Sequence, residues 1–224
     1  MGFASSKAQT APKRRKFSYV ISDPLDAAEA ANLTQSRARR AMIDSQLRTS
    51  GVNEPFVLKR MGAVPREQFV PAASSGKAYM DRAIRLDNGG WLPSPLVQGK
   101  MLEEANPAGT EHALVVDGGS GYLAELLRPL VAKLTVISPE DAIGAGRKGK
   151  GADLLVIDGA VEEIPAKLAN RLADGARIVT GLVGNGVTRV AVGRKTGSNV
   201  SLMPVFDTGI PQLHAFDTPK GWSF

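Results

Sequence analysis

The stretch LVVDGGSGYLAELL, residues 114–127, decides the fold that the sequence predicts. It begins with apolar and β-branched residues, continues with Asp117, and then has three glycines within four places, of which the last two are Gly119 and Gly121. From Tyr122 onward, leucines recur at helical spacing. This order predicts a buried parallel strand, a tight turn and the start of a helix. A ligand can approach bare backbone at such a turn, but a glycine-rich turn without a ligand has the same pattern.

Length and composition limit the class of protein. The 224 residues, 43% of them hydrophobic, suffice for one domain with an arm. Cysteine is absent, and the two histidines, His112 and His214, lie far apart, so neither thiol catalysis nor a Cys- or His-based metal site is expected. No apolar run reaches the roughly 18 residues of a membrane span. No secretory signal is recognisable, so we expect a cytoplasmic location or its matrix-side equivalent.

The net charge of +6 is concentrated at the N-terminus. Residues 1–40 hold eight basic and three acidic residues, or +5, and the remaining 184 residues hold 20 basic and 19 acidic residues, or +1. Because the charge belongs to an arm and not to the globular body, sequence-specific nucleic-acid binding is not expected.

The predicted domains are a basic arm over residues 1–36 and one folded domain over residues 37–224. Within the domain, residues 37–100 form a helical lead-in and a loop, and residues 101–224 form the core. The arm is either a solvated tail or a segment that becomes ordered on a protein partner, such as a multi-subunit complex at a membrane. Its candidate partner-binding residues are Lys13, Arg14, Arg15 and Lys16.

Further blocks of sequence accompany the glycine turn. MIDSQL, residues 42–47, and VPREQFVP, residues 64–71, precede it, and LVIDGA, residues 155–160, follows it. Together these blocks resemble the protein-L-isoaspartate O-methyltransferase family over roughly residues 38–218, and VPREQFVP is the most specific of them. The resemblance implies an α/β fold with a Rossmann-like methyltransferase sheet that ends in a C-terminal antiparallel hairpin.

The resemblance also implies a remnant cofactor site. The turn would hold S-adenosylmethionine, and the acid of the fourth-strand region would lie near it. For that acid a second interpretation stays open, since an acid at a strand end often caps the following helix. The implied site residues are Asp117, Gly119, Gly121, Tyr122 and Asp158.

Residues 87–101 of this chain lie where members of the family have their substrate-side loop. Active members carry a Ser or Thr there, two residues before a Pro, which helps to hold the isoaspartyl carboxylate. Here the Pro is Pro95 and the matching residue is Pro93, which has no hydroxyl. Ser94, one place away, is the one candidate for a catalytic residue, and it is also explained as an ordinary loop hydroxyl.

Three departures affect the cofactor side. The glycine turn is two residues shorter than in active members. Ser138 stands where they have the acid that binds the ribose, with Glu140 two residues later. Only 15 residues separate Ser138 from the strand that begins at Leu154, and one crossover alone needs at least about 10–12 residues. We therefore expect a sheet that lacks one edge strand and its helix, with a flexible basic loop over residues 139–153. In the family, the end of that strand binds the adenine.

The rest of the core follows a regular order. Apolar runs predict strands over residues 154–158 and 177–183, with a helix over residues 161–172 between them. Two further runs, residues 187–193 and 200–206, predict a hairpin.

Two functions remain open. The departures favour a degenerate family member without a bound cofactor, acting as an accessory or structural subunit of a larger assembly. Fold similarity does not carry function when the site is altered, and each lost buried hydrogen bond weakens cofactor binding by about 1–3 kcal/mol. The alternative is an active S-adenosylmethionine-dependent enzyme that methylates isoaspartyl residues in protein repair.

Overall fold

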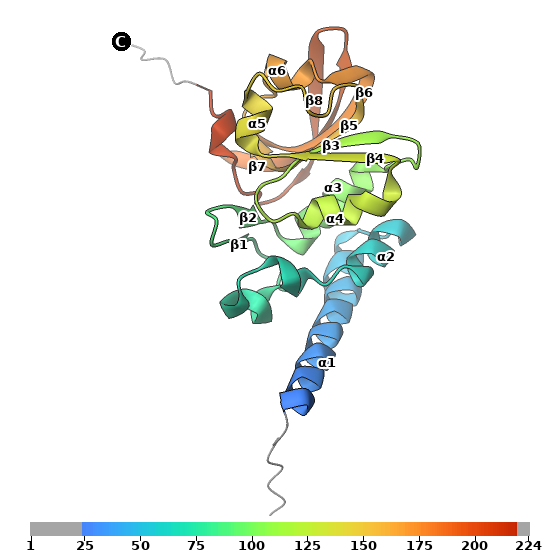
Figure 1. Ribbon diagram of the computed structural model, residues 1–224, viewed down its shortest axis with the longest axis vertical. Coiled ribbons are helices and arrows are strands. Elements are labelled where there is room, and N and C mark those ends of the chain that lie inside the picture. Colours follow the sequence, from blue (N-terminus) through green and yellow to red (C-terminus); the bar gives the residue numbers. More distant parts are fainter. Residues whose placement is uncertain (1–23, 219–224) are drawn as a thin grey trace, which may run out of the picture. The chain divides into compact units, whose positions relative to one another are not determined.

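The computed structural model describes residues 24–218 (Figure 1). The chain divides into two units, residues 1–34 and 35–224. Helix α1 (Pro24–Met42) supplies the described residues of the first unit and continues into the second, so the predicted boundary at residue 36 falls within a helix. The predicted partner-binding residues 13–16 lie outside the described residues. Within residues 24–218, no helix is both long and apolar enough to cross a membrane.

Short helices make up the first part of the second unit. Pro55 opens one of them, where its missing N–H leaves no helical hydrogen bond unmade. In chain order they are η1 (Ile43–Leu47), which is π-helical, η2 (Arg48–Ser50), α2 (Pro55–Ala63), η3 (Arg66–Phe69) and η4 (Ala72–Lys77).

A six-stranded sheet forms the centre of this unit, in the order β4-β3-β5-β6-β7-β8. β4, β3, β5 and β6 are parallel, whereas β7 and β8 pair antiparallel with their neighbours. This arrangement confirms the predicted Rossmann-like α/β sheet with its C-terminal antiparallel hairpin. The strands are β3 (His112–Val116), β4 (Lys133–Ile137), β5 (Ala152–Val161), β6 (Leu172–Gly184), β7 (Val187–Thr196) and β8 (Asn199–Asp207), and a separate small sheet consists of β1 (Ile84–Arg85) and β2 (Trp91–Leu92).

The connection between β4 and β5, all of which the structure describes, contains no strand. β4 is therefore the edge of the sheet, which confirms that one edge strand and its helix are absent. The prediction of a flexible loop over residues 139–153 is wrong at its start, where α5 (Pro139–Ile143) forms. Arg171 holds this helix, because its Nη2 donates to the carbonyl oxygens of Asp141 (2.5 Å) and Gly144 (3.1 Å).

β5 continues further than predicted. Its last residues pair on both sides, since Ala160 lies opposite Gly181 of β6 and also pairs with Gln212 of the C-terminal segment. The predicted helix over residues 161–172 is therefore wrong apart from one turn, α6 (Ala166–Ala169).

The C-terminal hairpin is tighter than predicted. Thr196 pairs with Asn199, so only residues 197–198 form the turn. Gly197 has a φ of 57°, a conformation that two-residue hairpin turns require and that glycine adopts without strain.

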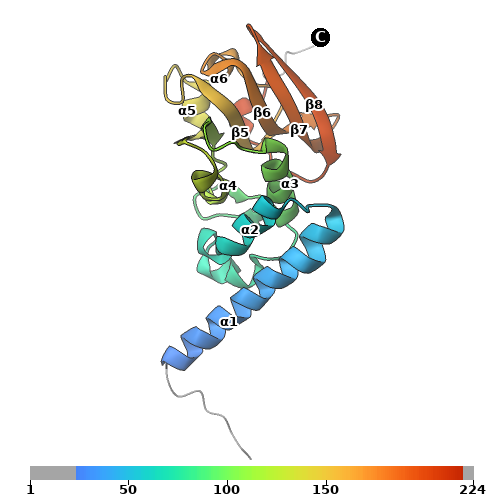
Figure 2. The same ribbon diagram turned by 90° about the vertical axis from the view of Figure 1, so that its right-hand side faces the viewer.

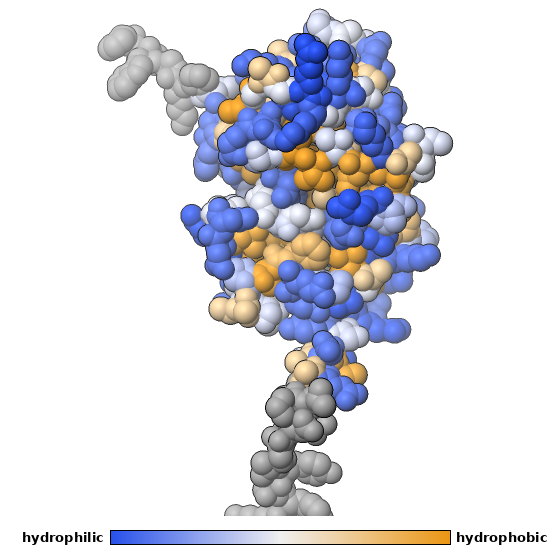
Figure 3. Space-filling model, in the orientation of Figure 1, coloured by the Kyte–Doolittle hydropathy of each residue, from blue (hydrophilic) through white to orange (hydrophobic). Residues whose placement is uncertain are grey.

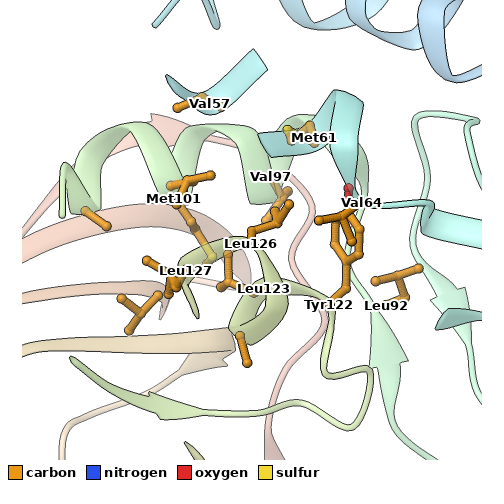
Figure 4. Packing of buried hydrophobic residues seen from close by; sticks show 14 of the residues in the cluster. Val57, Met61, Val64, Leu92, Val97, Met101, Tyr122, Leu123, Leu126 and Leu127 are labelled. Carbon is orange, nitrogen blue, oxygen red and sulfur yellow. The ribbon is translucent and has the colours of Figure 1, made fainter. Parts of the chain in front are cut away.

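Hydrophobic side chains fill both faces of the sheet. On one face, α3 (Pro95–Ala105) lies between α2 and the strands, next to α4 (Tyr122–Leu127) (Figure 2). α4 buries its leucines there, as the sequence predicts (Figure 4), and each such side chain contributes about 1.5–3 kcal/mol. The other face is covered by α5, α6 and the C-terminal segment, including Phe216 of η6 (His214–Phe216).

The β4 side of the sheet carries apolar residues on the surface (Figure 3). Val136 of β4 keeps 40% of its surface exposed.

Candidate functional site

A cleft of about 620 Å³ opens at the carboxyl ends of β3 and β4. In open α/β sheets, ligands bind at this edge. Four segments line the cleft: the loop at residues 88–91, the turn at residues 117–119, the β4–α5 junction at residues 136–141, and the C-terminal segment at residues 212–215.

Asp117 organises the glycine turn from within. Its Oδ1 accepts the N–H of Gly121 (2.8 Å). Burial raises the pKa of Asp117, although hydrogen bonds from the backbone of the turn oppose this shift. Gly119 (φ 110°) and Gly121 (φ 70°) have left-handed backbone conformations that other residues adopt only with strain. The acid and the two glycines therefore fix the path of the turn.

The loop at residues 88–91 lies directly on the turn. Trp91 N donates to the carbonyl oxygen of Gly118 (3.0 Å), and Asn88 Nδ2 donates to that of Gly119 (2.9 Å). A Cβ at Gly90 would lie 2.4 Å from the Gly118 oxygen, so only glycine fits there. Loop and turn thus form one wall of the cleft.

The structure separates Tyr122 from the cleft. Its side chain is fully buried, with its ring edge-on to Phe69 (5.1 Å between centroids) and beneath the guanidinium of Arg66 (5.0 Å). Burial raises the pKa of Tyr122 to about 12. Figure 4 shows the ring in the hydrophobic core, near Leu92 and Val64. Of the five residues predicted for the cofactor, Asp117 and Gly119 line the cleft.

Asp158 lies behind the turn and is 1% exposed. Both of its carboxylate oxygens accept from Gln98 Nε2 (3.1 Å each), and Oδ2 also accepts from Ser120 Oγ (3.3 Å). Burial, with the nearby Asp117 carboxylate, raises the pKa of Asp158 to about 7, against the opposing hydrogen bonds and the charge of Arg66. The interpretation of Asp158 as a helix cap is wrong, because β5 continues past it.

Ser94 occupies a structural position. It is 7% exposed, and its Oγ accepts the N–H of Val97 (3.4 Å) as the N-cap of α3. It does not belong to the lining of the cleft. In the structure the Ser94 hydroxyl caps a helix, which agrees better with the alternative interpretation as an ordinary loop hydroxyl than with a catalytic role.

The β4–α5 junction and the C-terminal segment form the second wall of the cleft, and several of their residues were not predicted as site residues. Ser138 and Glu140 were noted only as departures, and both line the cleft. The C-terminal segment reaches it because Ala160 N donates to the carbonyl oxygen of Pro211 (2.8 Å) and Leu213 N donates to that of Ala160 (2.8 Å). No apolar period marks this segment, so the sequence offered no signal for it. For the β4–α5 junction, the acid at Glu140 was the available signal.

The charge of the lining is negative. It contains the carboxylates of Asp117, Glu140 and Asp141, and none of the lining residues is Lys or Arg. Lys148 pairs with Asp141 (3.0 Å), but both side chains are well exposed, so this pair is screened by water. The cleft therefore suits a neutral or cationic ligand better than a phosphate. Within the described residues, no group of three or more His, Cys, Asp or Glu is placed to hold a metal ion.

Known proteins resemble the chain in sequence. Residues 37–144 match the family model of protein-L-isoaspartate(D-aspartate) O-methyltransferase. A protein-L-isoaspartate O-methyltransferase 2 from Anaeromyxobacter sp. is 32% identical over 174 residues, which cover 67% of this chain and 72% of the relative. A protein-L-isoaspartate O-methyltransferase from Roseiflexus castenholzii is 29% identical over 207 residues, or 80% of this chain and 94% of the relative.

A solved structure shares the fold. It is a putative protein-L-isoaspartate O-methyltransferase from Plasmodium falciparum in complex with S-adenosyl-L-homocysteine. The TM-score is 0.60 at 13% sequence identity, and the match covers 78% of this chain and 97% of the other.

Proposed function

Because the chain belongs to the protein-L-isoaspartate O-methyltransferase family, we propose that it is an active S-adenosylmethionine-dependent enzyme that methylates isoaspartyl carboxylates. The names of the relatives favour this function over the degenerate subunit that the sequence departures suggested. We likewise replace the expectation of no cofactor with S-adenosylmethionine, because the structural neighbour from Plasmodium falciparum is in complex with S-adenosyl-L-homocysteine.

The cleft is the observation that carries this proposal. Its volume of about 620 Å³ lies within the range of about 300–1,000 Å³ that is typical of small-molecule sites. S-adenosylmethionine has a net positive charge, because it carries a sulfonium and an ammonium group against one carboxylate. A lining with three carboxylates and neither Lys nor Arg complements that charge.

The residues present fit the cofactor. Gly118 and Gly119 present backbone without side chains to the cleft. Glu140 lines the opposite wall, and a carboxylate can accept both hydroxyls of a ribose at once. When bound, S-adenosylmethionine supplies an electrophilic methyl group. The protein has to hold cofactor and substrate in line and keep water out, and an ionised isoaspartyl carboxylate needs no general base.

Calorimetric titration tests the proposal. The full chain should bind S-adenosylmethionine with a micromolar dissociation constant, and it should transfer a labelled methyl group to an isoaspartyl peptide. The same peptide with a normal aspartyl residue is the control and should stay unlabelled. A dissociation constant weaker than about 1 mM, together with no labelled isoaspartyl peptide, would exclude the enzyme.

A non-catalytic accessory subunit is the second candidate. One observation favours it. Residues 88–91 bring no hydroxyl to the cleft, and the nearby Ser94, whose hydroxyl caps α3, does not line the cleft either. This candidate keeps the predicted contact between the basic arm and a protein partner. Size analysis of the untagged protein from its own cells tests it, because a free monomer of the chain mass contradicts a stable assembly. Deletion of residues 1–36 should release the protein if the arm is the anchor.

A further inference from the structure

A chain of buried polar side chains runs behind the glycine turn. Arg66 Nε donates to the carbonyl oxygen of Ala78 (2.7 Å), and its two Nη atoms donate to Gln98 Oε1 and to the carbonyl oxygen of Pro93. Gln98 in turn donates to both carboxylate oxygens of Asp158. Arg66 and Gln98 are 0% exposed and Asp158 is 1% exposed, so these bonds form out of contact with water.

The last bond of this chain reaches the turn itself. Ser120 Oγ donates to Asp158 Oδ2 (3.3 Å) and accepts the N–H of Tyr122 (3.2 Å). The backbones also touch here, because a Cβ at Gly118 would lie 2.3 Å from the carbonyl oxygen of Asp158. The loop that precedes α3 and the turn that lines the cleft are thus joined through three buried side chains, none of which lines the cleft.

We infer that Asp158 is a positioning residue: it fixes the glycine turn against the loop that precedes α3, and so sets the shape of the cleft without touching the ligand. The bond between Gly121 and Asp117 lies within the turn, so it maintains the shape of the turn but not its place. The bonds from residues 88–91 hold the turn from the side of the cleft. Asp158 holds it from the side of the core.

Two charged groups act on Asp158 from the elements around it. They are the carboxylate of Asp117 in the turn and the guanidinium of Arg66 in η3. Burial and Asp117 raise the pKa of Asp158 to about 7, so both protonation states are present near neutral pH. The ionised group accepts from Gln98 and Ser120. The protonated group can accept from Gln98 and donate to Ser120, and an Asn side chain can do the same without a charge.

Binding measurements on the full chain test this inference. This readout rests on the proposed function, because it requires the native chain to bind S-adenosylmethionine. Asp158→Ala should weaken the binding of S-adenosylmethionine by about tenfold, and Asp158→Asn should restore it to within about twofold. Circular dichroism confirms that each variant is folded. Asp153→Ala is the matched control. Asp153 stands near the start of β5 and accepts the N–H of His112 (2.9 Å), so its loss should leave the affinity unchanged.

Hydrogen exchange gives a readout that needs no ligand. The amides of Gly121 and Tyr122 should exchange at least about tenfold faster in Asp158→Ala, and at nearly native rates in Asp158→Asn and Asp153→Ala. If the native chain does not bind S-adenosylmethionine but this pattern holds, the proposed function fails and the positioning role stands.

Unchanged exchange and affinity in a folded Asp158→Ala variant overturn the inference. If that variant does not fold, Ser120→Ala gives the same test, because it keeps the buried carboxylate and removes the bond to the turn. It should accelerate exchange at Gly121 and weaken binding, and native exchange at Gly121 with native affinity overturns the inference. Exchange at Tyr122 does not count in this variant, because Ser120 Oγ itself accepts the N–H of Tyr122.

Discussion

The two walls of the cleft are built in different ways. The wall of residues 88–91 and 117–119 is backbone against backbone, with glycines at each close approach. The wall of residues 136–141 and 212–215 consists of a short helix and an irregular segment, and it carries the exposed side chain of Glu140. The structure of the first wall therefore requires residues without a side chain at the close contacts. What the second wall can bind is set by the chemical groups of its side chains. Substitutions should consequently affect stability at the first wall and ligand binding at the second.

The largest effect is expected behind the first wall, at Asp158. Burial raises its pKa from 3.8 to about 7, so the folded chain keeps a proton that the unfolded chain has lost between these two values. The free energy of unfolding therefore falls as the pH rises through this window, by up to about 4 kcal/mol. Asp158→Asn should remove this fall. Urea unfolding at about pH 4 and about pH 8 measures it, and the same pH dependence in both proteins contradicts the prediction.

A slightly smaller effect is expected at Gly118. A Cβ there would lie 2.3 Å from the carbonyl oxygen of Asp158, and no flexible side chain can move to make room. Gly118→Ala should lower the free energy of unfolding by about 3 kcal/mol. Gly109 has no atom within 4 Å of its Cβ position, so Gly109→Ala should change stability by less than about 0.5 kcal/mol. A similar loss of unfolding free energy in both variants would show that the close contact at Gly118 does not decide the stability of the first wall.

The second wall should respond in the opposite way. Glu140→Gln should weaken S-adenosylmethionine binding by about fivefold to tenfold, because it removes a carboxylate from the lining of the cleft. The free energy of unfolding should change by less than about 1 kcal/mol. Glu163→Gln, at an exposed site after β5, is the control and should bind normally. Equal affinity in the native chain and Glu140→Gln would remove Glu140 from the site.

The smallest effect concerns Ser94, outside both walls. Ser94→Ala should lower the free energy of unfolding by about 1 kcal/mol, since it removes the N-cap of α3. Ser94→Asp should restore the cap. Calorimetry should find the same cofactor affinity in all three proteins, and a loss of affinity in Ser94→Ala alone would return Ser94 to the functional site.

The difference between the walls also explains what the sequence could predict. The strand–turn–helix unit follows from short-range pattern, because apolar runs and glycines within residues 114–127 determine it. The absent edge strand follows from counting the 15 residues between Ser138 and Leu154. Both features depend only on residues that are close in the chain.

Contacts between residues far apart in the chain could not be predicted from such local patterns. Gln98 is a polar residue among the apolar residues of α3, and its burial makes sense only once Arg66 and Asp158 are placed beside it. The predicted helix over residues 161–172 failed because the C-terminal segment pairs with Ala160 and extends β5. That segment lies about fifty residues further along the chain, and no local pattern indicates the pairing.

The edge strand β4 has a consequence for the behaviour of the protein in concentrated solution. Only one side of β4 is paired in the described sheet, so the backbone N–H and C=O groups of its other side are a template for a strand from another molecule. Its length of five residues and the exposed Lys133 at its start oppose such pairing, whereas the exposed Val136 promotes it. Loss of the neighbouring strand thus removes a predicted adenine contact and at the same time creates a site where aggregation can begin.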